Sequence, residues 1–134
     1  MATHIMAALG FHYGEEVTSR MLATSVKAEP TFIRKSLSKL AKAGLVVTRR
    51  GKNGACALAR TPAEITLRDI YLASEAPCLV AGHCYPVETE CPVSAHFAEC
   101  MASIQAATQR SLEEALATTT LADVVREIRK RASG

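Results

Sequence analysis

The 134-residue chain has no tryptophan, and aromatic residues of all kinds make up only 4% of it. A core must therefore be built from Ala, Leu, Ile, Val and Met, a composition typical of helical domains. No apolar run approaches the roughly 20 residues that span a bilayer. The first residues also lack the positive start and the cleavage site of a signal peptide. We therefore expect a cytoplasmic protein that does not enter a membrane.

Acidic residues are nearly missing from one continuous segment. Between Val17 and Arg60, ten basic residues stand against a single acid, Glu29, which gives this segment a net charge of +9. The rest of the chain has six basic and twelve acidic residues, a net charge of −6. Lysine and arginine often form nothing more than a solvated surface, but charge concentrated in one segment indicates a polyanionic partner such as nucleic acid.

Helical spacing is clear on both sides of Pro30. Apolar residues at 21, 22 and 26 predict a short helix, with Thr18 or Ser19 as its N-cap. Pro30 suits the first turn of the next helix, and Gly44 suits its end. The polar residues of this second helix share one face, opposite the apolar ones. The expected apolar face consists of Phe32, Ile33, Leu37, Leu40 and Ala41, and the polar face of Thr31, Arg34, Lys35, Ser38 and Lys42.

Beyond Gly44 the pattern changes to two short strands, 45–48 and 55–58, around a basic turn that contains glycine. Two helices, a turn and a β-hairpin form a winged helix-turn-helix, so we expect a mainly α fold with a small β-hairpin wing. In such a fold Thr31, Arg34 and Lys35 approach base edges or phosphates in the major groove. The wing residues that would reach the DNA backbone or the minor groove are Arg49, Arg50 and Lys52.

The second half of the chain predicts three more helices. Thr66 with Asp69, and Thr120 with Asp123, have the spacing of N-terminal capping pairs. The segment from Pro92 to 117 predicts a helix roughly 37 Å long, which so small a domain cannot cover alone, so we expect a two-fold dimer seam along it. The expected organisation is a winged helix-turn-helix domain at 1–76, a cysteine loop at 77–91, and a dimerisation helix with a C-terminal helix at 92–134.

Three cysteines, Cys78, Cys84 and Cys91, lie in the loop with five and six residues between neighbours. Three kinds of site fit them: an iron-sulfur cluster held by thiolates, a metal-free thiol pair that senses oxidants, or zinc completed by a histidine. Cys56 falls within a predicted strand and is expected to be packed. No nucleophile with an orienting base and no carboxylate pair is evident, so we do not expect an enzyme.

Several stretches together resemble the Rrf2 family of bacterial transcription regulators over essentially the whole chain. They are Val17-Thr18 through Leu22-Ala23, Leu37-Ser-Lys-Leu-Ala-Lys-Ala-Gly44-Leu45-Val46, Arg50-Gly51-x-x-Gly54, Leu58-Ala59-Arg60-x-Pro62-x-x-Ile65-Thr66-Leu67-x-Asp69-Ile70, and Thr120-Leu-Ala-Asp-Val124. The segments Ile70-Tyr-Leu-Ala and Cys91-Pro-Val-Ser resemble a branch similar to the YwnA-type regulators.

The resemblance implies a homodimer that binds double-stranded DNA at a roughly palindromic promoter site. Some members hold an iron-sulfur cluster on three cysteines of one loop, and the positions that match are Cys78, Cys84 and Cys91. A [2Fe-2S] cluster that controls DNA affinity is therefore one expectation, and a thiol/disulfide sensor of the same fold is its alternative. From another class, a redox or metal-handling protein without specific DNA binding is also considered.

Overall fold

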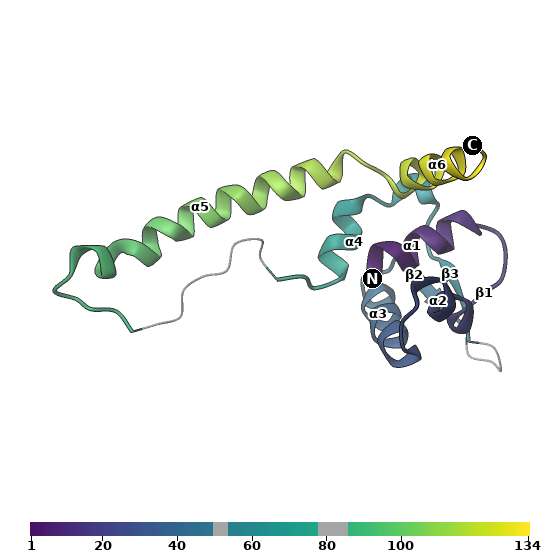
Figure 1. Cartoon of the computed structure of the whole chain (residues 1–134), viewed down its shortest axis with the longest axis horizontal. Coiled ribbons are helices and arrows are strands. Elements are labelled where there is room, and N and C mark those ends of the chain that lie inside the picture. The colour runs from purple at the N-terminus through teal and green to yellow at the C-terminus, as the bar shows by residue number, and fades with distance from the viewer. Residues whose placement is uncertain (50–53, 78–85) are drawn as a thin grey trace. The chain divides into compact units, whose positions relative to one another are not determined.

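The structure, a computed structural model, describes residues 1–49, 54–77 and 86–134 (Figure 1). The chain forms two compact units. The first comprises Met1–Glu75 together with Leu116–Gly134, and the second comprises Ala76–Ala115. The sequence grouped the C-terminal helix with the long helix before it, whereas in the structure the C-terminal helix belongs to the first unit.

Three helices form the framework of the first unit: α1 (Ala2–Phe11), α2 (Ser19–Val26) and α3 (Pro30–Lys42). Thr18 caps α2 by accepting a hydrogen bond from the backbone nitrogen of Met21 at 3.2 Å. Pro30 occupies the first turn of α3, where a missing N–H costs no hydrogen bond. Gly44 follows α3 with a φ of 74°, a conformation that a Cβ disfavours. The predicted helices and their end signals are thus confirmed.

A three-stranded antiparallel sheet completes the winged helix-turn-helix. Its strands are β1 (Val17–Thr18), β2 (Val46–Thr48) and β3 (Ala55–Leu58), in the order β1-β3-β2. The predicted hairpin is β2 with β3, in which Val47 lies opposite Ala57. Strand β1 was not predicted, because two residues are too few to show alternation. It pairs Val17 with Cys56, so the chain entering α2 is part of the wing sheet.

One aliphatic core holds the first unit together. Its large side chains that are fully buried are Ile5, Met6, Leu22, Ile33, Leu40, Leu45, Ile65, Ile70 and Leu121. No aromatic residue is among them, as the composition predicts. Cys56 is also buried in this core, which confirms its expected packing. The prediction for Phe32 was wrong: its side chain is 54% exposed, because Ile33 takes the buried position and successive helical residues point about 100° apart.

Two further helices, α4 (Leu67–Ala73) and α6 (Leu121–Ala132), begin side by side. A short 3₁₀ helix, η1 (Pro62–Glu64), precedes α4 in the chain. The backbone nitrogen of Leu67 donates to the carbonyl oxygen of Thr119 at 2.9 Å, and that of Leu121 donates to the carbonyl oxygen of Ile65 at 2.7 Å. These bonds satisfy backbone groups at the two helix starts, which otherwise lack partners within their helices.

Both helices start with the predicted capping boxes. The backbone nitrogen of Asp69 donates to the Thr66 hydroxyl, and the backbone nitrogen of Thr66 donates to the Asp69 carboxylate. Thr120 and Asp123 repeat this exchange in α6. The hydrogen bonds from the Thr120 backbone and hydroxyl, and then that from Arg126, hold the pKa of the half-buried Asp123 carboxyl below its ordinary value.

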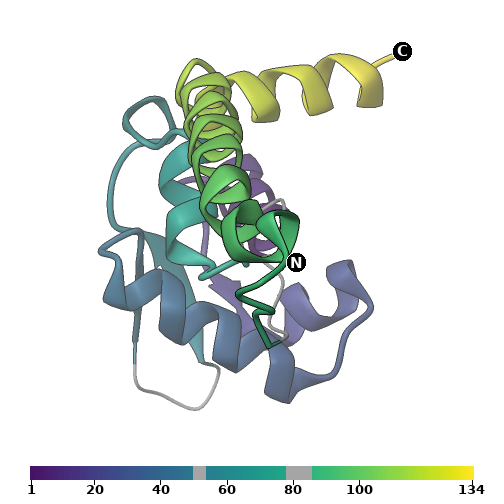
Figure 2. The same ribbon diagram turned by 90° about the vertical axis from the view of Figure 1, so that its left-hand side faces the viewer.

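Helix α6 packs against α1, and α1 lies between α6 on one side and α2 with α3 on the other (Figures 1 and 2). The contact is close at Gly10, where an added Cβ would lie 2.9 Å from Cγ2 of Val125. Arg129 adds a polar link, since its guanidinium donates to the carbonyl oxygen of Phe11 at 2.8 Å and lies 5.3 Å from the centre of the Phe11 ring. The C-terminal helix is therefore built into the first unit.

The long helix α5 spans Pro92–Ala117, with the predicted bounds. None of its 26 residues is buried. Its mostly apolar stripe consists of Phe97, Met101, Ile104, Thr108, Leu112 and Leu116. Among the described residues, no helix combines the length and the apolar character needed to cross a membrane.

We expect Gly10→Ala to destabilise the first unit by about 1–3 kcal/mol, because the new methyl group would lie 2.9 Å from Val125, whose β-branched side chain strongly prefers one rotamer in a helix. Val125→Ala alone should also destabilise, since it leaves a cavity. The double variant should be more stable than the sum of the two effects, because the methyl group added at position 10 fills the space that Val125 vacates. Urea denaturation of the four proteins measures this coupling, and strictly additive effects would show that Gly10 and Val125 do not contact each other.

Candidate nucleic-acid interface

The polar face of α3 is exposed along the helix. Thr31, Arg34 and Lys35, the residues expected to approach DNA, are all on the surface. Behind them Ile33, Leu37 and Leu40 are 0–4% exposed and fix α3 to the core. The helix therefore presents cations on a rigid support, as a helix that enters a DNA groove requires.

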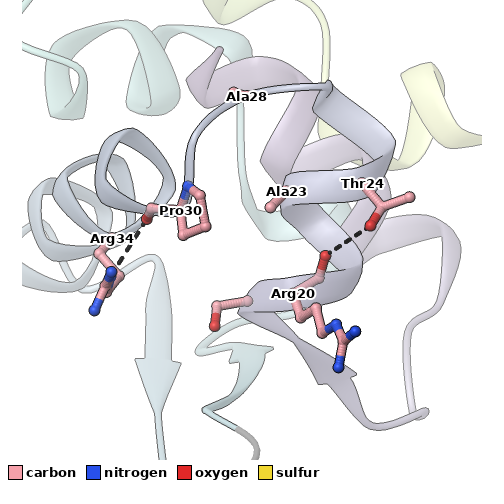
Figure 3. Close-up of a pocket in the computed structure, with 7 residues that line it drawn as sticks. Arg20, Ala23, Thr24, Ala28, Pro30 and Arg34 are labelled. Carbon is pink, nitrogen blue, oxygen red and sulfur yellow. Dashed lines mark hydrogen bonds between the residues drawn. The ribbon is translucent and has the colours of Figure 1, made fainter.

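A cleft of about 420 Å³ separates α2 from α3 (Figure 3). Its walls are Ser19, Arg20, Ala23, Thr24, Ala28, Pro30 and Arg34. Arg20 comes from α2 and Arg34 from α3, and none of the lining residues is acidic. Two guanidinium groups without an acid between them suit a phosphate, which arginine binds through its planar fork of N–H donors.

Local hydrogen bonds fix the backbone and the side chains of this cleft. The Thr24 hydroxyl donates to the carbonyl oxygen of Arg20 at 3.1 Å, and Nε of Arg34 donates to the carbonyl oxygen of Pro30 at 3.4 Å (Figure 3). The terminal nitrogens of Arg34 thus keep their donors for a ligand. Arg20 belongs to the basic segment but was not among the residues expected to contact DNA, because no spacing in the sequence places it beside Arg34.

The wing begins at Arg49, which is exposed directly after β2. Its backbone nitrogen donates to the carbonyl oxygen of Ala55 at 2.8 Å and so closes the described end of the hairpin. Gly54 has a φ of 56°, and its carbonyl oxygen accepts a hydrogen bond from the backbone nitrogen of Ser19 at 3.2 Å. This bond joins the base of the wing to the start of α2. Arg50 and Lys52 lie outside the described residues.

The expected sensor cysteines are described only in part, since Cys78 and Cys84 lie outside the described residues. Cys91 is exposed immediately before α5, and its carbonyl oxygen accepts a hydrogen bond from the backbone nitrogen of Ala95 at 2.9 Å. Cys56 is different: burial raises the pKa of its thiol, which donates to the carbonyl oxygen of Gly54. Within the described ranges no three histidine, cysteine or acidic residues are placed to hold a metal ion. The thiolate donor set itself suits an iron-sulfur centre.

Comparison with known proteins is consistent over nearly the full length. The model of the Rrf2 family, described as an iron-dependent transcriptional regulator, matches residues 1–127. The chain belongs to the Rrf2 family of transcriptional regulators. The match covers both the winged helix-turn-helix and the long helix α5, so the DNA-binding fold and the cysteine-containing segment belong to one family pattern.

Individual relatives agree with this assignment. YwnA of Bacillus subtilis (strain 168), named an HTH-type transcriptional regulator, is 31% identical over 129 residues, which cover 96% of this chain and 94% of that protein. A crystal structure of a transcriptional regulator from Lactobacillus plantarum is 25% identical, with a TM-score of 0.74 over 96% of this chain and 91% of that one. The structure of IscR from T. potens is also 25% identical, with a TM-score of 0.68 over 95% and 82% of the two chains.

Membership makes this chain a DNA-binding transcriptional regulator rather than an enzyme, as the sequence predicts. It also favours this function over that of a redox or metal-handling protein without specific DNA binding. The family match does not assign individual contacts, and the cleft between α2 and α3 adds Arg20 to the residues expected to make them.

We expect Arg20→Ala and Arg34→Ala each to weaken binding to any DNA duplex and to lower the slope of log affinity against log salt by about one phosphate contact. Fluorescence anisotropy over a series of salt concentrations measures both quantities. Arg131→Ala is the matched control, because it removes the same charge from α6, on the other side of α1. A control that lowers the slope as much as Arg20→Ala would show that only the total charge matters.

Proposed function

We propose that the protein is a cytoplasmic homodimeric regulator that binds a roughly palindromic promoter site through α3 and the wing. The observation that carries this proposal is the cationic surface shared by α2 and α3, on a unit whose segment Val17–Arg60 has a net charge of +9. Thr31, Arg34 and Lys35 enter the major groove, and Arg20 binds a phosphate beside it. The contacts of the wing with the backbone or the minor groove come from Arg49, Arg50 and Lys52.

The proposed dimer rests on α5. A helix of this length extends about 39 Å. No residue of α5 is buried, and an apolar stripe that stays partly in water is expensive. A second copy supplies the same stripe by two-fold symmetry, the commonest arrangement of soluble oligomers. A palindromic site has the same two-fold symmetry, with half-sites about one DNA turn, roughly 34 Å, apart.

We expect Ile104→Asp to convert the dimer to a monomer and to lower the affinity for a palindromic duplex by at least about tenfold, because a buried carboxylate at the seam lacks a partner. Ala106→Asp is the control, since Ala106 is exposed and points away from the stripe on the same helix. Light scattering coupled to size-exclusion chromatography gives the mass of each variant. A dimeric Ile104→Asp protein would exclude the stripe as the seam.

We further propose that Cys78, Cys84 and Cys91 hold a [2Fe-2S] cluster that controls DNA affinity. A cluster supplies a redox-dependent charge to the residues that bind it. Cys91 links this loop to α5, because its carbonyl oxygen accepts the first described hydrogen bond of that helix, from Ala95. A change at the Cys91 thiolate therefore acts directly on the start of α5. A fourth ligand is required, and His83, Glu88, Glu90, His96 and Cys100 are the candidates nearby.

We expect protein purified without oxygen to be brown and to contain iron and sulfide, both of which disappear in Cys84→Ala. Cys56→Ala should keep the colour, since Cys56 is buried in the core of the first unit. Iron and sulfide assays with visible absorbance measure the result. Colourless, iron-free protein after anaerobic reconstitution rejects the cluster. Equimolar zinc would then identify a zinc site, and an oxidant-induced bond between two loop cysteines, mapped by mass spectrometry, would identify the thiol sensor.

A further inference from the structure

Phe32 is exposed on a helix whose apolar side is otherwise buried. Ile33, Leu37 and Leu40 are 0–4% exposed, whereas Phe32 is 54% exposed. The residue lies in the first turn of α3, where its backbone nitrogen donates to the carbonyl oxygen of Glu29 at 3.0 Å. The N-terminal residues of a helix that enters the major groove are those that reach base edges. Phe32, the one aromatic residue of α3, thus lies at the N-terminal end of the helix.

Exposed cations lie on the same helical turn as Phe32. Nζ of Lys35 lies 6.0 Å from the centre of the Phe32 ring, within the range of a cation–π interaction. Thr31 and Arg34 are exposed on the same turn. Such surroundings favour a polyanion over an apolar protein partner, because a hydrophobic protein surface would have to desolvate the neighbouring cations. The ring is therefore an exposed apolar group beside exposed cations.

The major groove offers such a ring one apolar group on the base pairs, the 5-methyl of thymine, and phenylalanine is among the side chains that contact it. Lysine and arginine beside the ring bind phosphates and fix its position without reading sequence. Burial of one methyl group against the ring then distinguishes thymine from cytosine at a single position of each half-site.

We propose that Phe32 is a specificity-determining residue that contacts the 5-methyl group of one thymine in each half-site. This inference rests on the proposed binding of DNA through α3, and it deepens that function by naming a base and an atom. Lys35 acts as its positioning residue, since it holds the ring through the cation–π contact while its charge stays near the phosphates.

The probe is a duplex enriched from randomised DNA by the full-length protein, in which each thymine is replaced in turn by uracil. Uracil keeps the base pairing and removes only the 5-methyl group. For the wild-type protein we expect one replacement per half-site to weaken binding about fourfold, the factor that corresponds to roughly 0.8 kcal/mol for one buried methyl group. Phe32→Ala should bind the thymine and uracil duplexes equally, and Phe32→Leu should keep part of the difference.

Two measurements separate this role from a structural or electrostatic one. Phe32→Ala should weaken binding to the selected duplex more than binding to a scrambled duplex, and it should leave the slope against salt unchanged, because the ring is uncharged. Tyr13→Ala, which removes an aromatic side chain that is 53% exposed outside α3, should keep the wild-type dependence on the methyl group.

Three results would overturn the inference while leaving the proposed function intact. They are no effect of uracil on the wild-type protein, an undiminished uracil effect in Phe32→Ala, and an equal loss in Phe32→Ala on specific and scrambled duplexes. If the selection enriches no sequence at all, the proposed function fails and this inference fails with it.

Discussion

The rest of the structure depends on the backbone hydrogen bonds that join residues 65–67 to residues 119–121. The chain leaves the first unit after Glu75, forms the second unit and returns at Leu116. Leu121, which has no exposed surface, begins α6 with its backbone nitrogen bonded to Ile65. The two capping boxes lie at this junction and bond further backbone N–H groups of both helix starts. The unit that binds DNA is therefore completed by the last residues of the chain.

The basic residues of α2 and α3 make different contacts from those of α6. On α2 and α3, Arg20 and Arg34 border a cleft that no acid enters. On α6, Arg126 pairs with Asp123, Arg131 pairs with Glu127, and Arg129 binds the carbonyl oxygen of Phe11. The cations of α6 are thus largely engaged in local contacts. On α3, Lys39 pairs with Glu75, whereas Arg20 of α2 and Arg34 of α3 line a cleft that has no acidic lining residue. A net charge of +3 for the whole chain conceals this division.

The sequence predicted best those features that depend on local chemistry. The capping pairs at Thr66 and Thr120, the proline at the start of α3 and the glycine after it act within one turn, and each produced the expected boundary. Strand β1 could not be predicted, because it exists only through its pairing with β3. The apolar periodicity of α3 predicted that Phe32 is buried, which is wrong. A residue at the edge of an apolar stripe is buried only if a neighbouring side chain covers it. Arg20 and Arg34 lie beside the same cleft only in the folded unit, so their proximity could not be predicted from either helix alone. The other DNA contacts expected on α3 lie on an exposed face, and their roles remain predictions.

The junction between residues 65–67 and 119–121 makes the DNA-binding unit discontinuous in sequence. Its two parts, Met1–Glu75 and Leu116–Gly134, flank the Ala76–Ala115 segment and meet at the neighbouring starts of α4 and α6. A chain cut within the inserted segment would therefore lose Leu121 and Val125 from the core that supports the binding surface.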